Sequence, residues 1–298
     1  MSRVLIAEAV NASLSPLAGL DVDEQVGIWR DRRRLLEAVR ECEALIVRNQ
    51  TMVDAELVRA ALSLRVVGRL GAGLDNLDLD ALRERSIAVV HAGGLNAHAV
   101  AEYVLGACLA LARGIAASDR EVRRGGWTRR IGLEMRGQTL GVIGLGATGA
   151  ETARLAMALG MRVLGHDPFI EPPAGVEQLA LADLLSRSRF VSVHVALNDS
   201  TRGLLSAGAL AVLPRGAYVI NTARGGVIDE QALLFALESG HLGGAALDVR
   251  AQEPPGLDDA LAQRDDVLVT AHIAGLTIES QQAIAEHVLG GVRQALTA

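Results

Sequence analysis

The stretch from Thr139 to Asp167 constrains the fold of this chain more than any other. It begins with a short apolar run, Thr139 to Ile143, which leads into Gly144-Leu145-Gly146-Ala147-Thr148-Gly149. A segment with helical periodicity follows, and a second apolar run, Met161 to Leu164, leads to Asp167. A strand, a glycine-rich turn, a helix and a second strand, with an acid about 20 residues after the glycines, predict a βαβ unit that binds a dinucleotide.

Each glycine of this motif has its own expected role. Gly144 would allow the sharp turn out of the strand, Gly146 would leave room for a pyrophosphate beside the main chain, and Gly149 would let the helix pack closely on the sheet. The pyrophosphate then lies at the start of the helix, where free N–H groups and the helix dipole favour negative charge. Asp167 is expected to accept hydrogen bonds from ribose hydroxyls and to repel a 2′-phosphate. The sequence therefore favours NAD over NADP.

Length and composition narrow the class of protein. With 298 residues the chain is long enough for two domains, and with 50% apolar and only 2% aromatic residues its cores must be aliphatic, as in buried parallel sheets. A formal net charge of −6 argues against a nucleic-acid-binding surface and favours a cytoplasmic protein. No signal peptide or membrane span is expected. Cys42 and Cys108 show no metal or redox spacing, so buried reduced thiols are expected.

The first 95 residues predict a small α/β domain. Apolar strands are expected at 4–7, 44–47, 65–70 and 87–90, with helices at 31–43, 54–62 and 79–85 between them, which is the pattern of a parallel sheet. Arg48 and Gly71-Ala72-Gly73 directly follow two of these strands, where ligands bind in such sheets. The glycines can offer main-chain N–H groups to a carboxylate. Arg48 is equally well interpreted as a solvated charge.

The middle of the chain predicts a long buried helix and a charged arm. Residues 96–113 are rich in Ala and Leu, so this helix is expected to be buried between domains or against another subunit. Residues 118–135 are interpreted as a surface arm or subunit contact. His91 and His98 flank a Gly-Gly turn without a third ligand in reach, so no metal is expected.

The second half predicts a six-stranded, doubly wound sheet. Further strands are expected at 190–195, 218–221, 244–249 and 267–271, with helices at 181–186, 203–213 and 230–239. Arg224, Glu253 and His272 follow three successive strands. Each alone is more simply a turn charge or a structural histidine, but on this topology the three together predict a single crevice.

Several motifs in a fixed order give the chain a resemblance to the D-isomer-specific 2-hydroxyacid dehydrogenase family, closest to its D-3-phosphoglycerate dehydrogenase branch. The resemblance spans about residues 45 to 287. It rests on the segments V-G-R-L-G-A-G-L-D-N-L-D (67–78), N-A-H-A-V-A-E-Y (96–103), G-V-I-G-L-G-A-T-G (141–149), N-T-A-R-G-G-V-I-D-E (221–230), G-A-A-L-D-V-R-A-Q-E-P-P (244–255) and A-H-I-A-G (271–275).

This resemblance implies two Rossmann-like, doubly wound parallel-sheet domains of the α/β class. The substrate domain would comprise residues 1–97 and 279–298, and the NAD-binding domain residues 98–278, with the active site in the cleft between them. No C-terminal regulatory domain is expected after Ala298.

The resemblance also implies roles for individual residues. Arg224 would bind the substrate carboxylate and the C2 oxygen, His272 would be the acid and base, and Glu253 would pair with His272. Arg48 would bind the distal group of the substrate. The implied cofactor-binding residues are Gly144, Gly146, Ala147, Thr148, Gly149, Asp167, Val195, Thr222, Ala223, Asp248, Ala274 and Gly275, and the implied substrate-binding residues are Arg48, Gly71, Ala72, Gly73, Arg224 and His272.

The expected function is therefore NAD-dependent interconversion of a D-2-hydroxy acid and its 2-oxo acid by hydride transfer, with a 3-phosphoglycerate-like or other anionic-tailed substrate. A hydroxypyruvate or glyoxylate reductase is the alternative enzyme. A non-catalytic, NAD-sensing module of the co-repressor type is the alternative from another class. A homodimer is expected from the buried helix and the 118–135 arm, without nucleic-acid or membrane partners.

Overall fold

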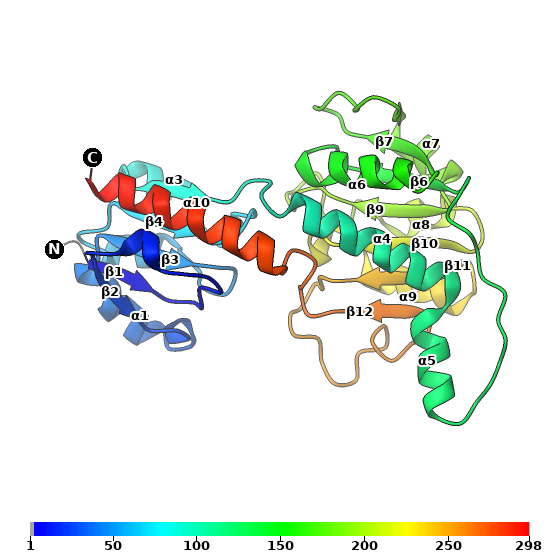
Figure 1. Ribbon diagram of the computed structural model, residues 1–298, viewed down its shortest axis with the longest axis horizontal. Helices are drawn as coiled ribbons and strands as arrows, with labels where there is room; N and C mark the ends of the chain where they lie inside the picture. The colour runs from blue at the N-terminus through cyan, green and yellow to red at the C-terminus, as the bar shows by residue number, and fades with distance from the viewer. Residues whose placement is uncertain (1–2, 298) are drawn as a thin grey trace. The chain divides into compact units, whose positions relative to one another are not determined.

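The computed structural model describes residues 3–297, which form two compact α/β units. Unit 1 contains the residues up to Asn96 together with those from Leu276 onward, and unit 2 contains Ala97–Gly275. The domain boundaries expected from the sequence lie between residues 97 and 98 and between residues 278 and 279. Figure 1 shows both units with most of their helices and strands labelled.

Unit 1 is a parallel sheet with the strand order β2-β1-β3-β4-β5. Its strands are β1 (Arg3–Ile6), β2 (Asp21–Glu24), β3 (Ala44–Val47), β4 (Val66–Arg69) and β5 (Ala88–His91). Its α-helices are α1 (Arg32–Ala38), α2 (Ala55–Ala60), α3 (Leu79–Glu84) and α10 (Ile278–Thr297), with 3₁₀ turns at Ser15–Leu17, Ile28–Arg30 and Val39–Glu41. The predicted helix over 31–43 is thus an α-helix followed by a 3₁₀ turn.

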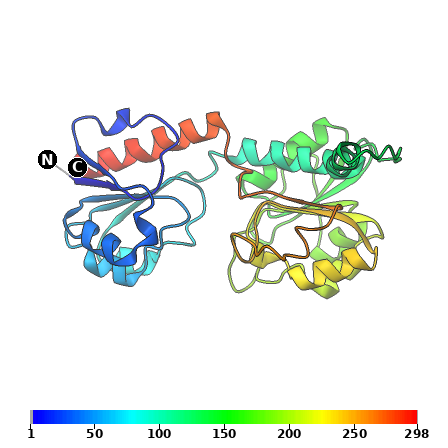
Figure 2. The same cartoon turned by 90° about the horizontal axis from the view of Figure 1, so that it is seen from below.

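Alternate side chains of the central strands point to opposite faces of this sheet. Leu5, Leu45 and Val67 pack with Leu35 of α1, Leu57 of α2 and Leu82 of α3, whereas Val4, Ile46 and Val66 pack with Val288 and Val292 of α10. Helix α10 packs so closely that a Cβ at Gly68 would lie 2.7 Å from both Ile46 Cδ1 and Val292 Cγ2. Figure 2 shows α10 on one face of the sheet and the other helices on the opposite face.

Unit 2 is a parallel sheet with the order β12-β11-β10-β9-β6-β7-β8. Its strands are β6 (Thr139–Ile143), β7 (Arg162–His166), β8 (Glu177–Gln178), β9 (Phe190–Val193), β10 (Ala217–Asn221), β11 (Leu242–Leu247) and β12 (Val267–Val269). Its helices are α4 (Ala97–Arg113), α5 (Ile115–Arg123), α6 (Ala147–Ala158), α7 (Leu181–Arg187), α8 (Ala207–Val212) and α9 (Glu230–Glu238), with a 3₁₀ turn at Gly225–Val227. The prediction of a doubly wound sheet is confirmed, and β8 adds a strand that the sequence did not predict.

Helix α4 lies inside its own unit. Val104, Ala107 and Cys108 of α4 share one apolar cluster with Ala153 and Ala156 of α6. The prediction that this helix is buried between domains or against another subunit was therefore wrong for these residues, because α6 and the sheet supply the apolar surface that covers them.

Both cysteines are buried and unbonded to each other, as predicted. Burial raises the pKa of the Cys108 thiol to about 12 and that of Cys42 to about 11, so neither forms a reactive thiolate near neutral pH. Within residues 3–297, no single helix has the length and apolarity to cross a membrane, although α4 and α5 taken as one bent pair do by length and composition.

Candidate active site

The turn between β6 and α6 has the shape that a bound pyrophosphate requires. Gly144 has a φ of 91°, a conformation that side chains rarely adopt, and a Cβ there would lie 2.7 Å from the His194 carbonyl oxygen. A Cβ at Gly149 would lie 1.9 Å from the Gly144 carbonyl oxygen, so only glycine lets α6 approach the strand end. Gly146 has nothing within 4 Å of its Cβ position. The turn at Gly144 and the close packing at Gly149 therefore agree with expectation, and the space beside Gly146 is open.

The start of α6 is open to an anionic ligand. Gly146 is the N-cap, and no side chain caps the first N–H groups of the helix, which Ala147 and Thr148 begin. The turn follows β6, where the order of strands in the sheet changes direction. Strands β7 and β8 lie on one side of β6, and the next strand in the sequence, β9, lies on its other side. Dinucleotides bind at such a reversal in open parallel sheets. The residues present therefore fit the pyrophosphate of a dinucleotide.

Asp167 lies at the end of β7 and is bonded to the same turn. Its Oδ2 accepts a hydrogen bond from Leu145 N at 2.8 Å, and its Oδ1 accepts from Phe169 N and Ile170 N at 2.9 and 3.1 Å. Partial burial alone would raise the pKa of this carboxyl, but the three N–H donors outweigh it and the pKa is lowered. The carboxylate is thus charged and oriented, as hydrogen bonding to a ribose requires.

The loop after β10 carries Arg224 and one unsatisfied polar atom. Asn221 shapes the loop, because its Oδ1 accepts from Ala223 N at 3.0 Å and its Nδ2 donates to Arg224 O at 2.9 Å. The Arg224 side chain donates to Ala223 O through Nη1 at 2.6 Å. Thr222 Oγ1 is buried and has no hydrogen-bond partner in the described residues, which is consistent with a missing polar ligand at this implied cofactor residue.

His272 and Glu253 form a pair, although they are far apart in the sequence. His272 Nδ1 lies 3.0 Å from Glu253 Oε2, and each side chain is about one-third exposed, at 33% and 32%. His272 also has a φ of 56°, an uncommon conformation for a residue other than glycine. Strained main chain of this kind clusters at functional sites. Because Nδ1 faces Glu253, the other ring nitrogen, Nε2, is not engaged by this carboxylate.

Asp248 explains how His272 is held in this conformation. Its carboxylate is 1% exposed; Oδ1 accepts from Ile273 N and Thr270 Oγ1 at 2.8 and 2.6 Å, and Oδ2 accepts from Ala274 N at 2.8 Å. The main chain adds a bond from His272 N to Asp248 O at 2.9 Å. The resemblance implied that Asp248 binds the cofactor; within the described residues, its carboxylate fixes the loop that carries the histidine.

In unit 1, the loop that carries Arg48 is held by two residues that the sequence did not single out. Glu8, which is 5% exposed, accepts from the N–H groups of Arg48, Gln50 and Thr51 at 2.9, 3.2 and 2.8 Å. Asn76 Nδ2 donates to the carbonyl oxygens of Arg48 and Thr51 at 2.8 and 2.7 Å. The sequence feature that could have pointed to Glu8 is its position two residues after a buried strand, β1, which pairs with β3.

The predicted glycine loop of unit 1 follows β4. A Cβ at Gly71 would lie 1.7 Å from Arg69 Nη1, so a side chain there would require the arginine side chain to move. Gly71 therefore has a packing reason to be glycine besides the expected binding of a carboxylate by residues 71–73. The arginine itself is buried, at 6% exposure.

The fold and these geometries define an NAD-binding dehydrogenase. The model of the D-isomer specific 2-hydroxyacid dehydrogenase NAD-binding domain matches residues 105–274, and the chain belongs to this family. Its members act on the CH–OH group of 2-hydroxy acids, and this chain is accordingly an NAD-dependent oxidoreductase of that class.

Individual relatives narrow the comparison. The chain is 44% identical to (S)-sulfolactate dehydrogenase of Chromohalobacter salexigens, with 99% of each chain covered. It is 41% identical to D-3-phosphoglycerate dehydrogenase of Archaeoglobus fulgidus over 94% of this chain, but spans only 54% of that protein. Among solved structures, the TT0316 protein of Thermus thermophilus superposes with a TM-score of 0.94 at 34% identity, covering 99% of this chain and 97% of that one.

Proposed function

We propose that this enzyme interconverts a 2-hydroxy acid bearing a second anionic group and the corresponding 2-oxo acid, with Arg224 and His272 as catalytic residues. The observation that supports this most directly is the His272–Glu253 pair, held by the buried Asp248 on a loop with unusual backbone geometry. A histidine supported in this way is suited to general acid and base chemistry.

The side chains divide the work of the reaction between them. Bound NAD supplies the acceptor of a hydride in oxidation, and NADH the donor in reduction. The Arg224 guanidinium binds the substrate carboxylate and polarises the C2 carbonyl, which a planar fork does better than a point charge. His272 Nε2 donates a proton to the carbonyl oxygen as C2 is reduced and accepts it from the hydroxyl in the reverse direction. Glu253 orients the imidazole through Nδ1.

Arg48 is the residue that we propose for the distal group of the substrate. Its main chain is fixed on both sides by Glu8 and Asn76, which gives the guanidinium a defined starting point. The two relatives described above are named for sulfolactate and phosphoglycerate, which are 2-hydroxy acids with a second anion. A cation at the end of β3 suits either substrate.

A panel of 2-oxo acids with NADH tests this function. We expect the highest kcat/KM with sulfopyruvate or phosphohydroxypyruvate, and a loss of about 10- to 100-fold in R48Q with these two acids only, because one charged hydrogen bond is removed. Equal kcat/KM for glyoxylate and no effect of R48Q would favour the hydroxypyruvate or glyoxylate reductase. Tight NADH binding with no turnover of any acid would favour the sensing module.

We further propose that the enzyme is a homodimer whose partner covers the arm after α5. A groove of about 510 Å³ lies in unit 2, lined by residues that include Leu111, Ala117, Arg130, Ile131 and Leu268. Trp127 and Ile131 are exposed at 80% and 102%, which is unusual for large apolar side chains of a segment bonded to its own unit. Light scattering should report a dimer for the wild type and a monomer for W127E/I131E.

A cytoplasmic location is proposed as well. It is supported by the net charge of −6 and by two buried, unpaired cysteines.

A further inference from the structure

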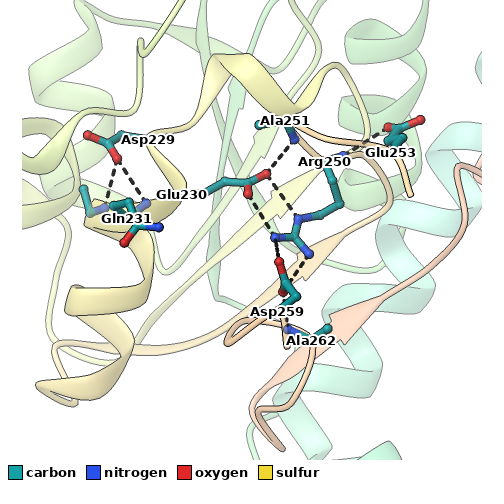
Figure 3. A network of polar contacts seen from close by, with 9 residues as sticks. Asp229, Glu230, Gln231, Arg250, Ala251, Glu253, Asp259 and Ala262 are labelled. Atoms are coloured by element: carbon teal, nitrogen blue, oxygen red, sulfur yellow. Dashed lines mark hydrogen bonds and ion pairs between the residues drawn. The ribbon is translucent and has the colours of Figure 1, made fainter. Parts of the chain in front are cut away.

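Arg250 is the centre of a buried ionic cluster directly beside the proposed catalytic pair. Its side chain is 4% exposed and lies between two carboxylates. Nε and Nη2 donate to Glu230 Oε1 and Oε2 at 3.2 and 2.9 Å, and Nη1 and Nη2 donate to Asp259 Oδ1 and Oδ2 at 3.0 and 2.7 Å (Figure 3). These two bidentate pairs, one with each carboxylate, fix both the position and the plane of the guanidinium.

Both carboxylates are tied to the main chain around them, Glu230 in a helix and Asp259 in the turns before β12. Glu230 is the first residue of α9, whose N-cap Asp229 accepts from Gln231 N and Ala232 N. Asp259 Oδ1 accepts from Ala262 N at 2.8 Å. Burial by itself would lower the pKa of Arg250, but the two carboxylates raise it well above its ordinary value, and the arginine in turn lowers the pKa of Asp259. The arginine and Asp259 therefore each favour the charged form of the other.

A main-chain hydrogen bond connects the clamped arginine to the proposed catalytic pair. Arg250 N donates to Glu253 Oε1 at 3.1 Å, while the other oxygen of Glu253, Oε2, faces His272 Nδ1 at 3.0 Å. The next N–H, that of Ala251, donates to Glu230 Oε1 at 2.8 Å. One carboxylate oxygen of Glu253 is thus held by the clamped residue and the other by the histidine.

The same peptide also supports the loop that carries Arg224. A Cβ at Gly225 would lie 1.9 Å from Arg250 C and 2.1 Å from Ala251 N, so the main chains of the two loops are in direct contact. Gly225 immediately follows Arg224 in the sequence. A shift of the 250–251 peptide would therefore move Glu253 and the Arg224 loop together.

From this geometry, and on the basis of the proposed function, we propose that Arg250 is a positioning residue for the reaction: its clamp on Glu230 and Asp259 holds the Glu253 carboxylate, and through it the His272 imidazole, in the orientation that proton transfer requires. Stability alone does not account for the clamp, since apolar side chains of similar volume commonly replace buried ion clusters without loss of stability.

A double-mutant cycle separates positioning from a merely structural effect. R250K keeps the charge but loses the fork, and we expect it to lower kcat about 10-fold through misplacement of reacting groups, with the Kd for NADH unchanged. In the E253Q background, the same substitution should change kcat by less than about twofold, because the group through which Arg250 acts is already altered. An equal loss in both backgrounds, or a wild-type kcat for R250K, would overturn the inference.

R187K is the matched control for loss of a fork. Arg187 makes a bidentate pair with Glu177 at 2.8 and 3.0 Å in the same unit, but on the surface and without a bond to the loops described above. We expect kcat of R187K to equal that of the wild type. If R250K fails to fold, D259N takes its place in the cycle, since it removes one of the two ion pairs of Arg250. We then expect a smaller loss of kcat, which should again be reduced in the E253Q background.

Amide hydrogen exchange provides a readout that does not depend on activity. Peptides covering 249–254 should exchange faster in R250K than in R187K, because the clamp no longer restrains the loop. If the wild type reduces no 2-oxo acid, the proposed function fails and the inference about proton transfer fails with it. Exchange then tests only whether Arg250 restrains the loop of Glu253: faster exchange in R250K would show that it does, and equal exchange would show that it does not. Turnover by the wild type together with unaltered R250K kcat and exchange would overturn only the inference.

Discussion

At the scale of single residues, the proposed site is built from side chains that bind main-chain groups. Asp248 holds the loop of His272, Arg250 N holds Glu253, and Glu8 holds the loop of Arg48. Glu8 and Asp248 are far in the sequence from the loops that they hold. Arg250 is only three residues from Glu253, but its own position depends on Glu230, 20 residues away. This is why Arg224, Glu253 and His272 were predictable from strand ends and motifs, whereas Glu8, Asn76 and Arg250 were not: Glu8 and Thr51 are 43 residues apart, and no local pattern links them.

The left-handed backbone of His272 provides a way to separate its chemistry from its effect on the fold. Asparagine tolerates positive φ better than alanine does. We expect H272N and H272A both to lose about 10²-fold or more in turnover, since neither transfers a proton, with NADH affinity retained. H272N should unfold at a higher denaturant concentration than H272A. Wild-type turnover in either variant would exclude His272 as the acid and base.

Asp167 should set the choice between NADH and NADPH. Its carboxylate is charged and lies beside the turn that fits the pyrophosphate, so it would repel a 2′-phosphate. We expect the ratio of kcat/KM for NADH over NADPH to fall by about 10-fold in D167N, equivalent to 1.4 kcal/mol. Asparagine preserves one acceptor oxygen for Leu145 N. An unchanged ratio would assign the preference to another residue.

At the scale of elements, apolarity decided which strands were predictable. β3, β4, β6 and β9 are covered on both faces, so each appears in the sequence as a short run of buried residues. β2 and β8 have no such run, because the first is Asp-Val-Asp-Glu and the second only two exposed polar residues at an edge. Such edge strands are defined by their neighbours rather than by their own composition.

Two glycines of the β6–α6 turn should respond differently to the same added methyl group. In G149A the Cβ would meet the Gly144 carbonyl oxygen, so we expect a loss of about 1–3 kcal/mol in the free energy of unfolding from overpacking. In G146A the Cβ enters open space, so stability should change little, while NADH binding weakens because the methyl group occupies the place of the pyrophosphate. Denaturant titration and NADH fluorescence measure the two effects.

The opposite pattern would contradict the geometry of this turn. A destabilised G146A with normal NADH affinity would mean that the open space beside Gly146 does not receive the cofactor. A fully stable G149A would mean that α6 does not depend on close contact with the end of β6.

At the scale of the whole molecule, each unit has its own apolar cores on the two faces of its own sheet. The alternation of strands and helices predicted this organisation, and the resemblance predicted that α10 returns to the first unit. Local sequence patterns did not predict the order of strands within each sheet. That order depends on whether each connecting segment places the next strand on one side of the preceding strand or on the other.

Acid stability of the molecule should depend on His194. Its ring packs beside Ser192, with Oγ 2.8 Å from Nε2, and burial lowers the imidazole pKa from 6.5 to about 4. Between these two values the unfolded chain binds the proton more readily than the folded one, so stability is complete above pH 6.5 and is lost as the pH falls towards 4. At 1.36 kcal/mol per pH unit, the difference between 6.5 and about 4 corresponds to a loss of at most roughly 3–4 kcal/mol, which solvent screening reduces because the residue is only half-buried.

Denaturant titrations between pH 7 and pH 4 measure this effect. H194Q, which cannot take up the proton, should show a flatter dependence of the free energy of unfolding on pH than the wild type. H287Q, which alters an exposed histidine of α10, is the control and should follow the wild type. Identical slopes for H194Q and the wild type would show that other groups cause the acid sensitivity.

The way in which the loop of residues 48–51 is held has an evolutionary consequence. The hydrogen bonds of Glu8 and Asn76 to this loop go to its N–H and C=O groups, so they fix its path, and the charge of Glu8 additionally favours a cation at position 48. Substitutions at positions 48 to 50 can therefore exchange the group presented to a substrate while the loop keeps its course. Descendants of one ancestor can acquire new substrate preferences here by point mutation, without first rebuilding the scaffold.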